Sequence, residues 1–364
     1  MRVGFLCAEY PTVARRYGGI GTATQTLARA LAATPHHDAT VYVCGDREGQ
    51  EFDRGVRVHL MRCEQPWPDM RRLQATLRQA LAAGEVDLVE SPECEAHCLP
   101  GGPGTVVRMN GGHHFGCATV RQRRRWRRLF LEQYGIRRAA GLCAVSHFAA
   151  RTTREAMRLG RRTIDVLPNA IDTRCFRPKP ESVQPGRIVF VGSLVEKKGI
   201  FDLLNVFPSV RAEFSAAQLL IVGAAPDAEA RRRVEALAGE GVQILGPQPR
   251  ERVAELMAGA QVCVFPSHME TQGIVLAEAQ ACGRPVIGTD AGPGPEVIGP
   301  DGQNGWLVPV ADSATLARLI CHALRSPQLC DEMGTRAHEW ATDRFSLYAR
   351  LGANLAFWEQ HRRR

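Results

Sequence analysis

The sequence has no segment that would place the chain across a membrane. No stretch approaches the roughly 18 uninterrupted apolar residues that a membrane-spanning helix needs. The first residues, MRVGFLCAEYP, carry one positive charge and too short an apolar run for a secretory signal peptide. We therefore expect a cytoplasmic protein, either free or held peripherally at the inner face of the membrane.

Two common ligand signatures are also absent. Cysteine and histidine residues gather in one region of the chain: Cys94, His97, Cys98, His113, His114 and Cys117. They lack the paired C-x-x-C spacing of a zinc knuckle, so a metal site is disfavoured. The glycines after the first predicted strand do not form G-x-G-x-x-G, so a dinucleotide cofactor is poorly supported.

The composition is that of a globular protein. Hydrophobic residues make up 45% of the 364-residue chain and charged residues 23%. The net charge of +8 favours anionic partners such as nucleotides, phospholipid surfaces or nucleic acid. Of the twelve cysteines, several lie in apolar runs, where we expect small buried side chains rather than disulfides: Cys7, Cys44, Cys143 and Cys263.

Short β-type runs alternate with helical stretches, which predicts an α/β protein with two doubly wound, Rossmann-like parallel sheets. The alternation runs from RVGFLC to GLCAVS, and again from RIVFVGSL to GWLVPV. Between these two parts, the proline-rich residues 174–186 predict a linker. We place the domains at residues 1–178 and 186–344, and we expect a helix at residues 345–364 to cross back onto the first domain.

Ligands of such sheets bind beyond the carboxyl ends of the strands, so we expect a site in a cleft between the two sheets. After the first strand, Gly18, Gly19 and Gly21 open a helix whose backbone amides could bind phosphate, although a tight turn alone would also use them. In the second domain, VFVGSLVEKKG places Lys198 before a helix, where it could neutralise a diphosphate.

The stretch ETQGIVLAE contains two glutamates around an apolar run. We expect Glu270 in the loop after the strand QVCVFPS, Gly273 where the backbone approaches a ligand closely, and Glu278 within the next helix. A carboxylate on an apolar helix face is costly unless hydroxyl groups or a cation meet it. Ribose hydroxyls are such partners in nucleotide-binding folds. The alternative is a solvated glutamate on the exposed side of the helix.

Together these motifs make the chain resemble the retaining glycosyltransferases of the GT-B fold, specifically glycosyltransferase family 4. The resemblance covers nearly the whole chain. It rests on the order and spacing of short elements: GGIG, SHFAARTTRE, VLPNAID, VGSLVEKKGI, LLIVG, and ETQGIVLAE followed by AQACGRPVI. It implies a nucleotide-sugar donor, with UDP the commonest nucleotide of the family, and no catalytic metal or other cofactor.

The resemblance also implies roles by position. Glu278 would bind the donor ribose, Glu270 would lie beside the sugar and the diphosphate, and Lys198 would neutralise the diphosphate. The other donor-binding residues would be Gly18, Gly19, Ser193, Thr271, Gln272, Gly273, Ile274 and Val275, with the backbone amides of the last three on the phosphates. We count Glu270 and Lys198 among the catalytic residues.

Ser193 departs from the family pattern, which usually has an arginine at this position paired with Lys198 on the diphosphate. The loss of a bidentate guanidinium should weaken stabilisation of the leaving group, unless Arg15 or Arg16 replaces it.

A second departure is Asn110, which stands where the family often has a histidine. We expect the catalytic histidine to be His113, reaching the donor sugar or the acceptor hydroxyl. Asn110 and His114 would line the acceptor side of the same pocket. A structural role for either histidine is the alternative.

Residues 121–130, RQRRRWRRLF, predict a strongly basic amphipathic helix with Trp126, Leu129 and Phe130 on one stripe. Such a helix could bind an anionic membrane and bring the protein to a lipid-linked acceptor. The alternative is a solvated basic face above an ordinary core stripe. No aromatic stacking platform or recognition motif accompanies the arginines, so we expect no nucleic acid partner.

The sequence therefore predicts a retaining hexosyltransferase that uses a nucleotide-sugar donor. The acceptor hydroxyl would belong to a natural product, a lipid-linked intermediate or a cell-surface polysaccharide. Because no carboxylate is placed as a covalent nucleophile, we expect the acceptor to attack from the face that the diphosphate leaves. The alternatives are a nucleotide-sugar epimerase and a catalytically silent nucleotide-sugar-binding protein.

Overall fold

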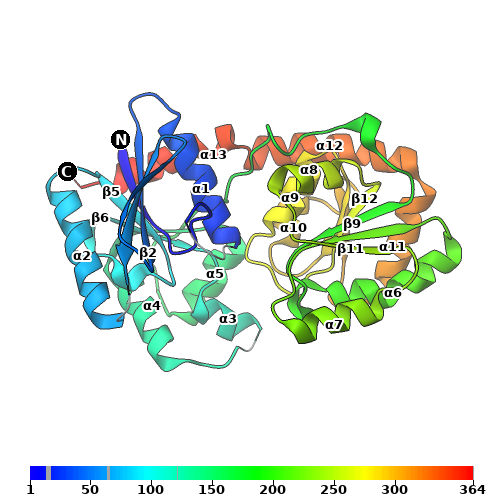
Figure 1. The fold of residues 1–364 in the computed structure, drawn as a ribbon, viewed down its shortest axis with the longest axis horizontal. Helices are drawn as coiled ribbons and strands as arrows, with labels where there is room; N and C mark the ends of the chain where they lie inside the picture. Colours follow the sequence, from blue (N-terminus) through cyan, green and yellow to red (C-terminus); the bar gives the residue numbers. More distant parts are fainter. Residues whose placement is uncertain (14–17, 64–65, 121, 364) are drawn as a thin grey trace. The chain divides into compact units, whose positions relative to one another are not determined.

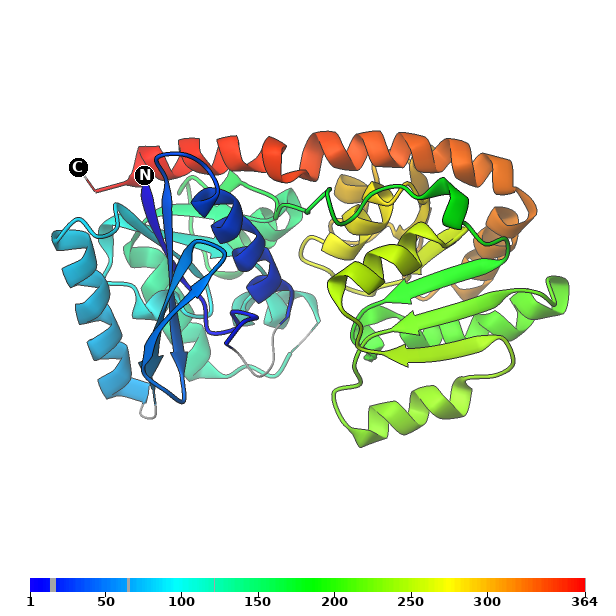
Figure 2. The same ribbon diagram turned by 45° about the horizontal axis from the view of Figure 1, so that its top comes forward.

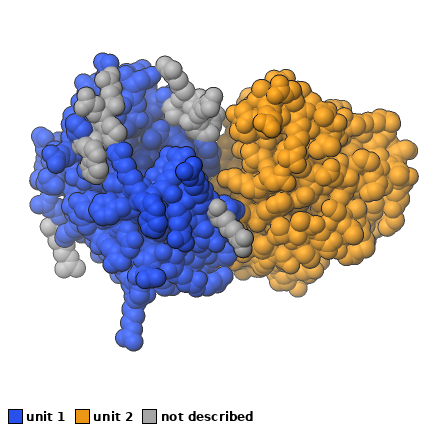
Figure 3. All heavy atoms as spheres, turned by 90° about the horizontal axis from the view of Figure 1, so that it is seen from below, with its two compact units in different colours: residues 1–170, 347–364 blue, residues 171–346 orange. Residues whose placement is uncertain are grey.

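The strands form two sheets, one in each of two compact units (Figures 1 and 3). The computed structural model describes residues 1–13, 18–63, 66–120 and 122–363. Unit 1 comprises residues 1–170 and 347–364, and unit 2 comprises residues 171–346. The division between the units thus falls within VLPNAID, a few residues before the linker at which the sequence analysis placed it.

The sheet of unit 1 has the order β3-β4-β2-β1-β5-β6-β7-β8 within the described residues. Its strands are β1 (Arg2–Leu6), β2 (Asp38–Gly45), β3 (Gly49–Asp53), β4 (Val56–Arg62), β5 (Leu88–Pro92), β6 (Gly102–Met109), β7 (Ala139–Ala144) and β8 (Asp165–Val166). The predicted parallel pairing is confirmed, except that β3 runs antiparallel to β4. Neither β3 nor β8 was predicted from the sequence: the residues of β3, GQEFD, form no apolar run, and β8 is only two residues long.

The helices of unit 1 are α1 (Gly19–Ala32), α2 (Pro66–Ala82), α3 (His113–Thr119), α4 (Trp126–Arg138), α5 (His147–Ala156) and α13 (Leu347–His361), with a 3₁₀ turn η1 (Ala96–Cys98). The C-terminal helix α13 is part of unit 1, although the whole of unit 2 precedes it in the chain. Leu351 and Leu355 pack against the same core cluster as the buried Phe357 and Trp358.

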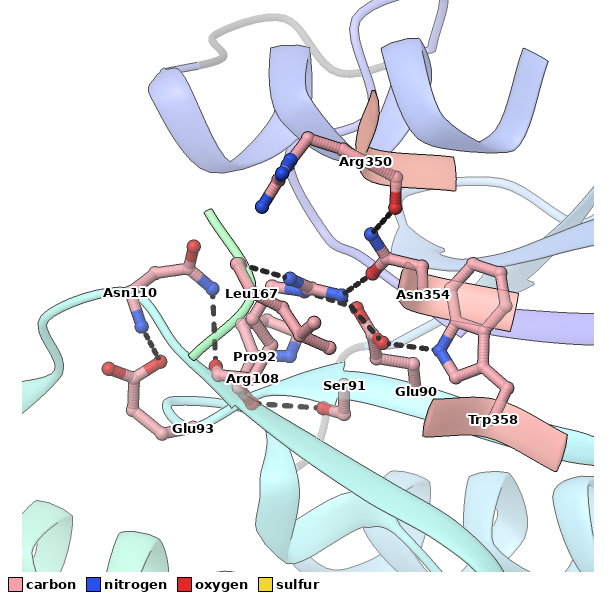
Figure 4. A network of polar contacts seen from close by, with 10 residues as sticks. All are labelled: Glu90, Ser91, Pro92, Glu93, Arg108, Asn110, Leu167, Arg350, Asn354 and Trp358. Atoms are coloured by element: carbon pink, nitrogen blue, oxygen red, sulfur yellow. Dashed lines mark hydrogen bonds and ion pairs between the residues drawn. The ribbon is translucent and has the colours of Figure 1, made fainter. Parts of the chain in front are cut away.

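A buried polar network joins α13 to the sheet of unit 1 (Figure 4). The Arg108 Nε atom lies 2.6 Å from Glu90 Oε1, and its Nη1 donates to the carbonyl of Leu167. Trp358 Nε1 donates to Glu90 Oε2 at 2.8 Å, while Asn354 Oδ1 accepts from Arg108 Nη2. All four side chains are buried. Because breaking a buried ion pair leaves an uncompensated charge, this network makes α13 an integral part of the unit.

The sheet of unit 2 is entirely parallel within the described residues, in the order β11-β10-β9-β12-β13-β14. Figure 2 shows part of this sheet, with the green arrows of β9, β10 and β11 side by side. Its strands are β9 (Arg187–Val191), β10 (Gln218–Val222), β11 (Val242–Gly246), β12 (Val262–Phe265), β13 (Val286–Thr289) and β14 (Gly305–Val308). The strand order reverses direction between β9 and β12. A doubly wound sheet forms its ligand crevice at such a switch point, beyond the carboxyl ends of the two strands.

The helices of unit 2 are α6 (Ile200–Glu213), α7 (Ala228–Leu237), α8 (Arg250–Ala258), α9 (Ile274–Ala281), α10 (Gly294–Ile298), α11 (Ser313–Arg325) and α12 (Pro327–Phe345), with 3₁₀ turns η2 (Pro180–Ser182) and η3 (Glu196–Lys198). Apolar side chains of β9 alternate between two core clusters: Ile188 packs in one and Val189 in the other. Both faces of the sheet are therefore covered, as its continuous apolar strands predict.

One cysteine prediction is wrong. Cys44 is not a free thiol, because it forms a disulfide with Cys63. The two residues are 19 positions apart in the chain, but β2 and β4 pair side by side with Gly45 opposite Arg62, which brings the Cα atoms of the cysteines to 5.5 Å. Cys7, Cys143 and Cys263 are free and buried, as predicted.

The predicted basic helix begins later than expected. Residues 122–125 are not helical, and α4 starts only at Trp126; Arg121 lies outside the described residues. Clustered arginines repel one another and are unfavourable at the positive end of a helix dipole, which opposes a helix across this run. Trp126 is 73% exposed and Phe130 65%, so the alternative of an ordinary core stripe is wrong. Among the described residues, none of the helices has the length and apolar character needed to span a bilayer.

We predict that Trp358→Phe destabilises unit 1, because it leaves the buried Glu90 carboxylate without one of its donors while it keeps most of the ring packing. The expected loss in the free energy of unfolding is about 1 to 3 kcal/mol, measured by urea denaturation. Tyr348→Ala, which removes a 96% exposed side chain of the same helix, is the control and should change stability by less than about 0.5 kcal/mol. Equal stability of Trp358→Phe and the wild type would contradict the prediction.

Candidate active site

Two of the predicted site residues meet at the switch point of unit 2. Lys198 follows β9 and Glu270 follows β12, the adjacent strand. The Lys198 Nζ atom lies 2.5 Å from Glu270 Oε1, and the Ser267 hydroxyl donates to the same oxygen at 3.0 Å. Lys198 is about one quarter exposed, so its ammonium remains accessible to a ligand at this edge. The structure thus brings together a cation and a carboxylate that are 72 positions apart.

A glycine allows this close approach. Gly199, directly after Lys198, has a positive φ of 67°, and a Cβ atom at this position would overlap the carbonyl oxygen of Pro266. The backbone N–H of His268 donates to the carbonyl of Lys197 at 2.9 Å, which fastens the two loops to each other. The position of Lys198 is therefore determined by backbone packing as well as by its ion pair.

The helix α9 begins at the same edge. Gly273 is its N-cap residue, with a positive φ of 76°, and Ile274 and Val275 form the first turn. The first N–H groups of a helix have no acceptor within that helix, and the helix dipole adds a partial positive charge there. Thr271 is half-buried and Gln272 is buried in the preceding turn. This arrangement is suited to binding an anion such as a diphosphate.

Glu278 lies one turn into α9 and is only 8% exposed, so the alternative of a solvated glutamate is wrong. Burial raises the pKa of Glu278 to about 7, and Arg250 opposes this effect. The Arg250 Nη2 atom lies 3.7 Å from Glu278 Oε1. A cation is one of the two kinds of partner expected for Glu278 from the sequence, but Arg250 itself was not predicted, because it belongs to no recognised motif.

Ser193 is exposed just beyond the end of β9, at the same edge as Lys198. Its neighbour Gly192 donates its backbone N–H to the carbonyl of Val222. Arg15 and Arg16, which the sequence analysis considered as replacements for the usual arginine, lie outside the described residues. Their role stays a prediction.

In unit 1, a buried glutamate organises the loop after β6. The Glu93 carboxylate accepts three successive backbone N–H groups, from Asn110 at 2.8 Å and from Gly111 and Gly112 at 2.6 Å each. Burial raises the pKa of Glu93 to about 7. Asn110 also lines a pocket of unit 1 together with Ile20 of α1. The structure therefore places Asn110 beside the N-terminal part of α1, the helix that begins at Gly19.

A second buried glutamate continues this arrangement. Glu132 of α4 accepts the backbone N–H groups of His113 and His114, and its Oε2 lies 3.0 Å from His114 Nδ1. The His113 Nε2 atom accepts the backbone N–H of Arg125 at 2.9 Å. Both imidazole rings are buried and each has a partner within the protein. The structure thus shows a structural function for both histidines, and the catalytic function of His113 stays a prediction.

The glycines after the first strand, Gly18, Gly19 and Gly21, lie at the start of α1. Gly18 is the N-cap residue of this helix, and its N–H donates to Glu9 Oε2 at 3.2 Å. A Cβ atom at Gly21 would overlap the backbone of Glu9, so glycine is required there for packing. Gly18 and Gly19 are not constrained in this way, and their contribution to donor binding stays a prediction. Within the described ranges, no three His, Cys, Asp or Glu side chains come together as a metal site would require.

Comparison with known proteins identifies the family and the fold. A family model described as Glycosyltransferase Family 4 matches residues 17–174, and one described as Glycosyl transferases group 1 matches residues 185–326. The structure of sucrose-phosphate synthase from Thermosynechococcus elongatus is similar, with a TM-score of 0.83, 20% identity, and coverage of 99% of this chain and 98% of that chain. The fold is therefore GT-B, the architecture of one large class of nucleotide-sugar-dependent glycosyltransferases.

Curated relatives include a GDP-mannose-dependent alpha-(1-6)-phosphatidylinositol monomannoside mannosyltransferase of Mycolicibacterium smegmatis, which is 27% identical over 94% of each chain. An MMP alpha-(1->4)-mannosyltransferase of Mycolicibacterium hassiacum is 28% identical over 54% of this chain and about half, 48%, of its own length. The chain belongs to glycosyltransferase family 4, a family of retaining enzymes, and the resemblance seen in the sequence is confirmed.

We predict that Glu132→Ala loosens residues 110–114, the loop after β6 and the first two residues of α3, because two backbone N–H groups and one imidazole lose their common acceptor. Hydrogen exchange of peptides from this loop should be at least about tenfold faster, which corresponds to about 1.4 kcal/mol of lost protection. Glu155→Ala, which removes an exposed glutamate of α5, should leave exchange in the loop unchanged. Unchanged exchange in Glu132→Ala would show that Glu132 does not hold the loop.

Proposed function

We propose that the protein transfers a hexose, with retention of configuration, from a nucleotide-sugar donor to an acceptor hydroxyl. The observation that carries the proposal is the ion pair of Lys198 and Glu270 beside the N-terminus of α9, with the buried carboxylate of Glu278 one turn further along the same helix. The Lys198 cation and the amides at the start of α9 match the diphosphate of a nucleotide-sugar, and the Glu278 carboxylate matches its ribose.

In the proposed mechanism, the bond between the sugar and the diphosphate breaks while the acceptor hydroxyl approaches from the same face. Negative charge grows on the departing diphosphate, where Lys198 and the first amides of α9 stabilise it by preorganised electrostatics. Glu270 orients the Lys198 ammonium before the ligand arrives, and it lies beside the positive charge that develops on the sugar. The proton of the acceptor hydroxyl passes to a phosphate oxygen, so no covalent nucleophile is required.

We infer that the donor nucleotide is UDP or GDP. UDP is the proposal from the sequence, whereas the relative that aligns over 94% of the chain is described as GDP-mannose-dependent. A thermal-shift panel of UDP- and GDP-linked hexoses distinguishes them, since a ligand at one hundred times its Kd stabilises the folded state by about 2.7 kcal/mol.

We predict that Glu278→Ala mainly weakens donor binding, because a charged acceptor of ribose hydroxyls is lost. A hydrogen bond to a charged group contributes about 1.5 to 3 kcal/mol, so the donor Kd should rise roughly ten- to hundredfold. Isothermal titration with the nucleotide-sugar selected by the panel measures the effect. Glu251→Ala, at an exposed glutamate of α8, is the control. An unaltered Kd for Glu278→Ala would contradict the assignment of the ribose site.

We predict that Lys198→Ala mainly lowers turnover, because the growing charge on the leaving group loses its ammonium. Removal of one such stabilising group lowers kcat by about 10²- to 10³-fold, measured as release of nucleoside diphosphate. Lys197→Ala removes the adjacent, exposed lysine and should retain wild-type kcat. Equal turnover in the two variants would argue against the catalytic role of Lys198.

We further propose a lipid-linked acceptor and peripheral binding at the inner face of the membrane through residues 122–134. Trp126, Phe130 and Tyr134 recur every four residues on α4 and are all exposed, and the rings of the last two stack at 6.3 Å. Exposed arginines flank this stripe: Arg123, Arg124, Arg125, Arg127 and Arg128. Near an anionic lipid surface, each basic residue contributes about 1 kcal/mol. The M. smegmatis relative is described as acting on a phosphatidylinositol monomannoside.

We predict that the wild type sediments with vesicles of phosphatidylglycerol and phosphatidylcholine, and that added salt weakens this binding. Trp126→Ala combined with Phe130→Ala should reduce it at least about tenfold, because the apolar anchors are lost. Phe52→Ala, at an equally exposed phenylalanine outside α4, is the matched control. Failure of the wild type to bind at low salt would exclude the membrane surface and favour a soluble acceptor.

The alternative of a catalytically silent binding protein should be tested, because Ser193 stands where the family usually has an arginine that assists Lys198. Family membership supports transfer over an epimerase reaction. Slow hydrolysis of the bound nucleotide-sugar in the absence of acceptor would show that the site is catalytically competent. Tight donor binding with no hydrolysis and no transfer would favour the silent alternative.

A further inference from the structure

Arg250 lies beside Glu278 in a position determined by packing. It is the first residue of α8, after β11, and its guanidinium carbon lies 5.1 Å from the centre of the Phe176 ring. Phe176 itself is buried in the core of unit 2. A planar guanidinium on an aromatic face is held by both cation–π attraction and stacking. The position of the Arg250 cation is therefore set by the fold.

The distance between Arg250 and Glu278 is that of an ion pair without a direct hydrogen bond. The separation of 3.7 Å between Nη2 and Oε1 exceeds normal hydrogen-bond lengths. Arg250 therefore attracts the Glu278 carboxylate electrostatically, but its Nη2 atom is too far from Oε1 to form a hydrogen bond with it. The Glu278 side chain is 10% exposed and that of Arg250 is 28% exposed, so solvent screens their attraction only in part.

We propose that Arg250 is a positioning residue that keeps the Glu278 carboxylate ionised and oriented toward the ribose hydroxyls of the donor nucleotide. This inference rests on the ribose-binding role of Glu278 proposed above. Arg250 itself acts through the carboxylate and need not touch the sugar or the phosphates.

The charges around Glu278 support this role. Among the described residues, the titratable groups that interact with it are Arg250 on α8, Cys282 at the end of α9, and Cys175 in the segment before β9. Burial raises the pKa of both thiols, so they stay neutral near pH 7. Burial also raises the pKa of Glu278 to about 7, and Arg250 acts in the opposite direction. Without Arg250, the carboxylate would take up a proton at a higher pH and become a weaker acceptor.

The test compares each nucleoside diphosphate with its own 2′,3′-dideoxy form. Titration calorimetry with UDP and GDP between pH 6 and 8.5 gives the affinity ratio of the ribo to the dideoxy ligand. Both ligands carry the same diphosphate, so the effect of diphosphate protonation on affinity cancels in this ratio. In the wild type, this ratio should fall as the pH falls through about 7, because Glu278 becomes protonated.

In Arg250→Met the midpoint of this pH profile should move upward by about one unit, so that the ratio at pH 7 falls about fivefold. Arg252→Met, on the same helix, should retain the wild-type profile, because Arg252 is exposed and paired with Glu255. Arg250→Lys keeps the charge and should retain a midpoint close to that of the wild type. Arg250→Gln serves in place of Arg250→Met if the latter does not fold.

Two further outcomes separate this inference from the function on which it rests. If Glu278→Ala leaves the ribo to dideoxy ratio unchanged, the ribose-binding role of Glu278 is wrong. Glu278→Ala could instead lower the affinity ratio to about one while Arg250→Met keeps the wild-type pH profile. In that case the role proposed for Arg250 is wrong, and the role proposed for Glu278 stands. A shift in Arg250→Lys as large as that in Arg250→Met would show that the charge is not the cause.

Discussion

The parallel direction of the strands is the constraint on which the candidate site depends. Strands that run in the same direction end at the same edge of a sheet, and the segments that leave this edge are brought together. In unit 2, Lys198 follows β9, Arg250 follows β11 and Glu270 follows β12. In unit 1, Glu93 follows β5 and Asn110 follows β6. Residues far apart in the chain thus become neighbours without any local sequence signal.

A second common feature is that the buried charged side chains discussed above have partners within the protein. Arg108 and Glu90 neutralise each other in the core of unit 1. Glu93 and Glu132 instead use backbone N–H groups as partners, and they hold the loop of residues 110–114. This arrangement is consistent with the high cost of an isolated charge in a protein interior. At the edge of unit 2, Glu270 is the partner of the Lys198 ammonium.

Much of the fold could be predicted because its signals are local. The apolar runs of β9, β10 and β12 are continuous, and the glycines and lysines around Lys198 form an ordered motif. The predictions that failed depended on residues distant in the chain, or on repulsion between charges within the arginine run before α4. Cys44 finds Cys63 only because β2 and β4 pair, and α4 begins at Trp126 rather than at the start of its arginine run. The exposure of Trp126 and Phe130 likewise depends on how α4 packs on unit 1.

The amino-acid sequence by itself determined the two α/β units, the family, and the identity of Lys198, Glu270 and Glu278 as candidate site residues. It could do so because strand and helix periodicity and short motifs are properties of consecutive residues. Only the tertiary structure showed that Lys198 pairs with Glu270, that Glu278 is buried beside Arg250, and that Glu93 and Glu132 hold the loop after β6. These contacts join residues 17 to 72 positions apart. They exist because strand order and helix packing bring such residues together, which no local pattern records.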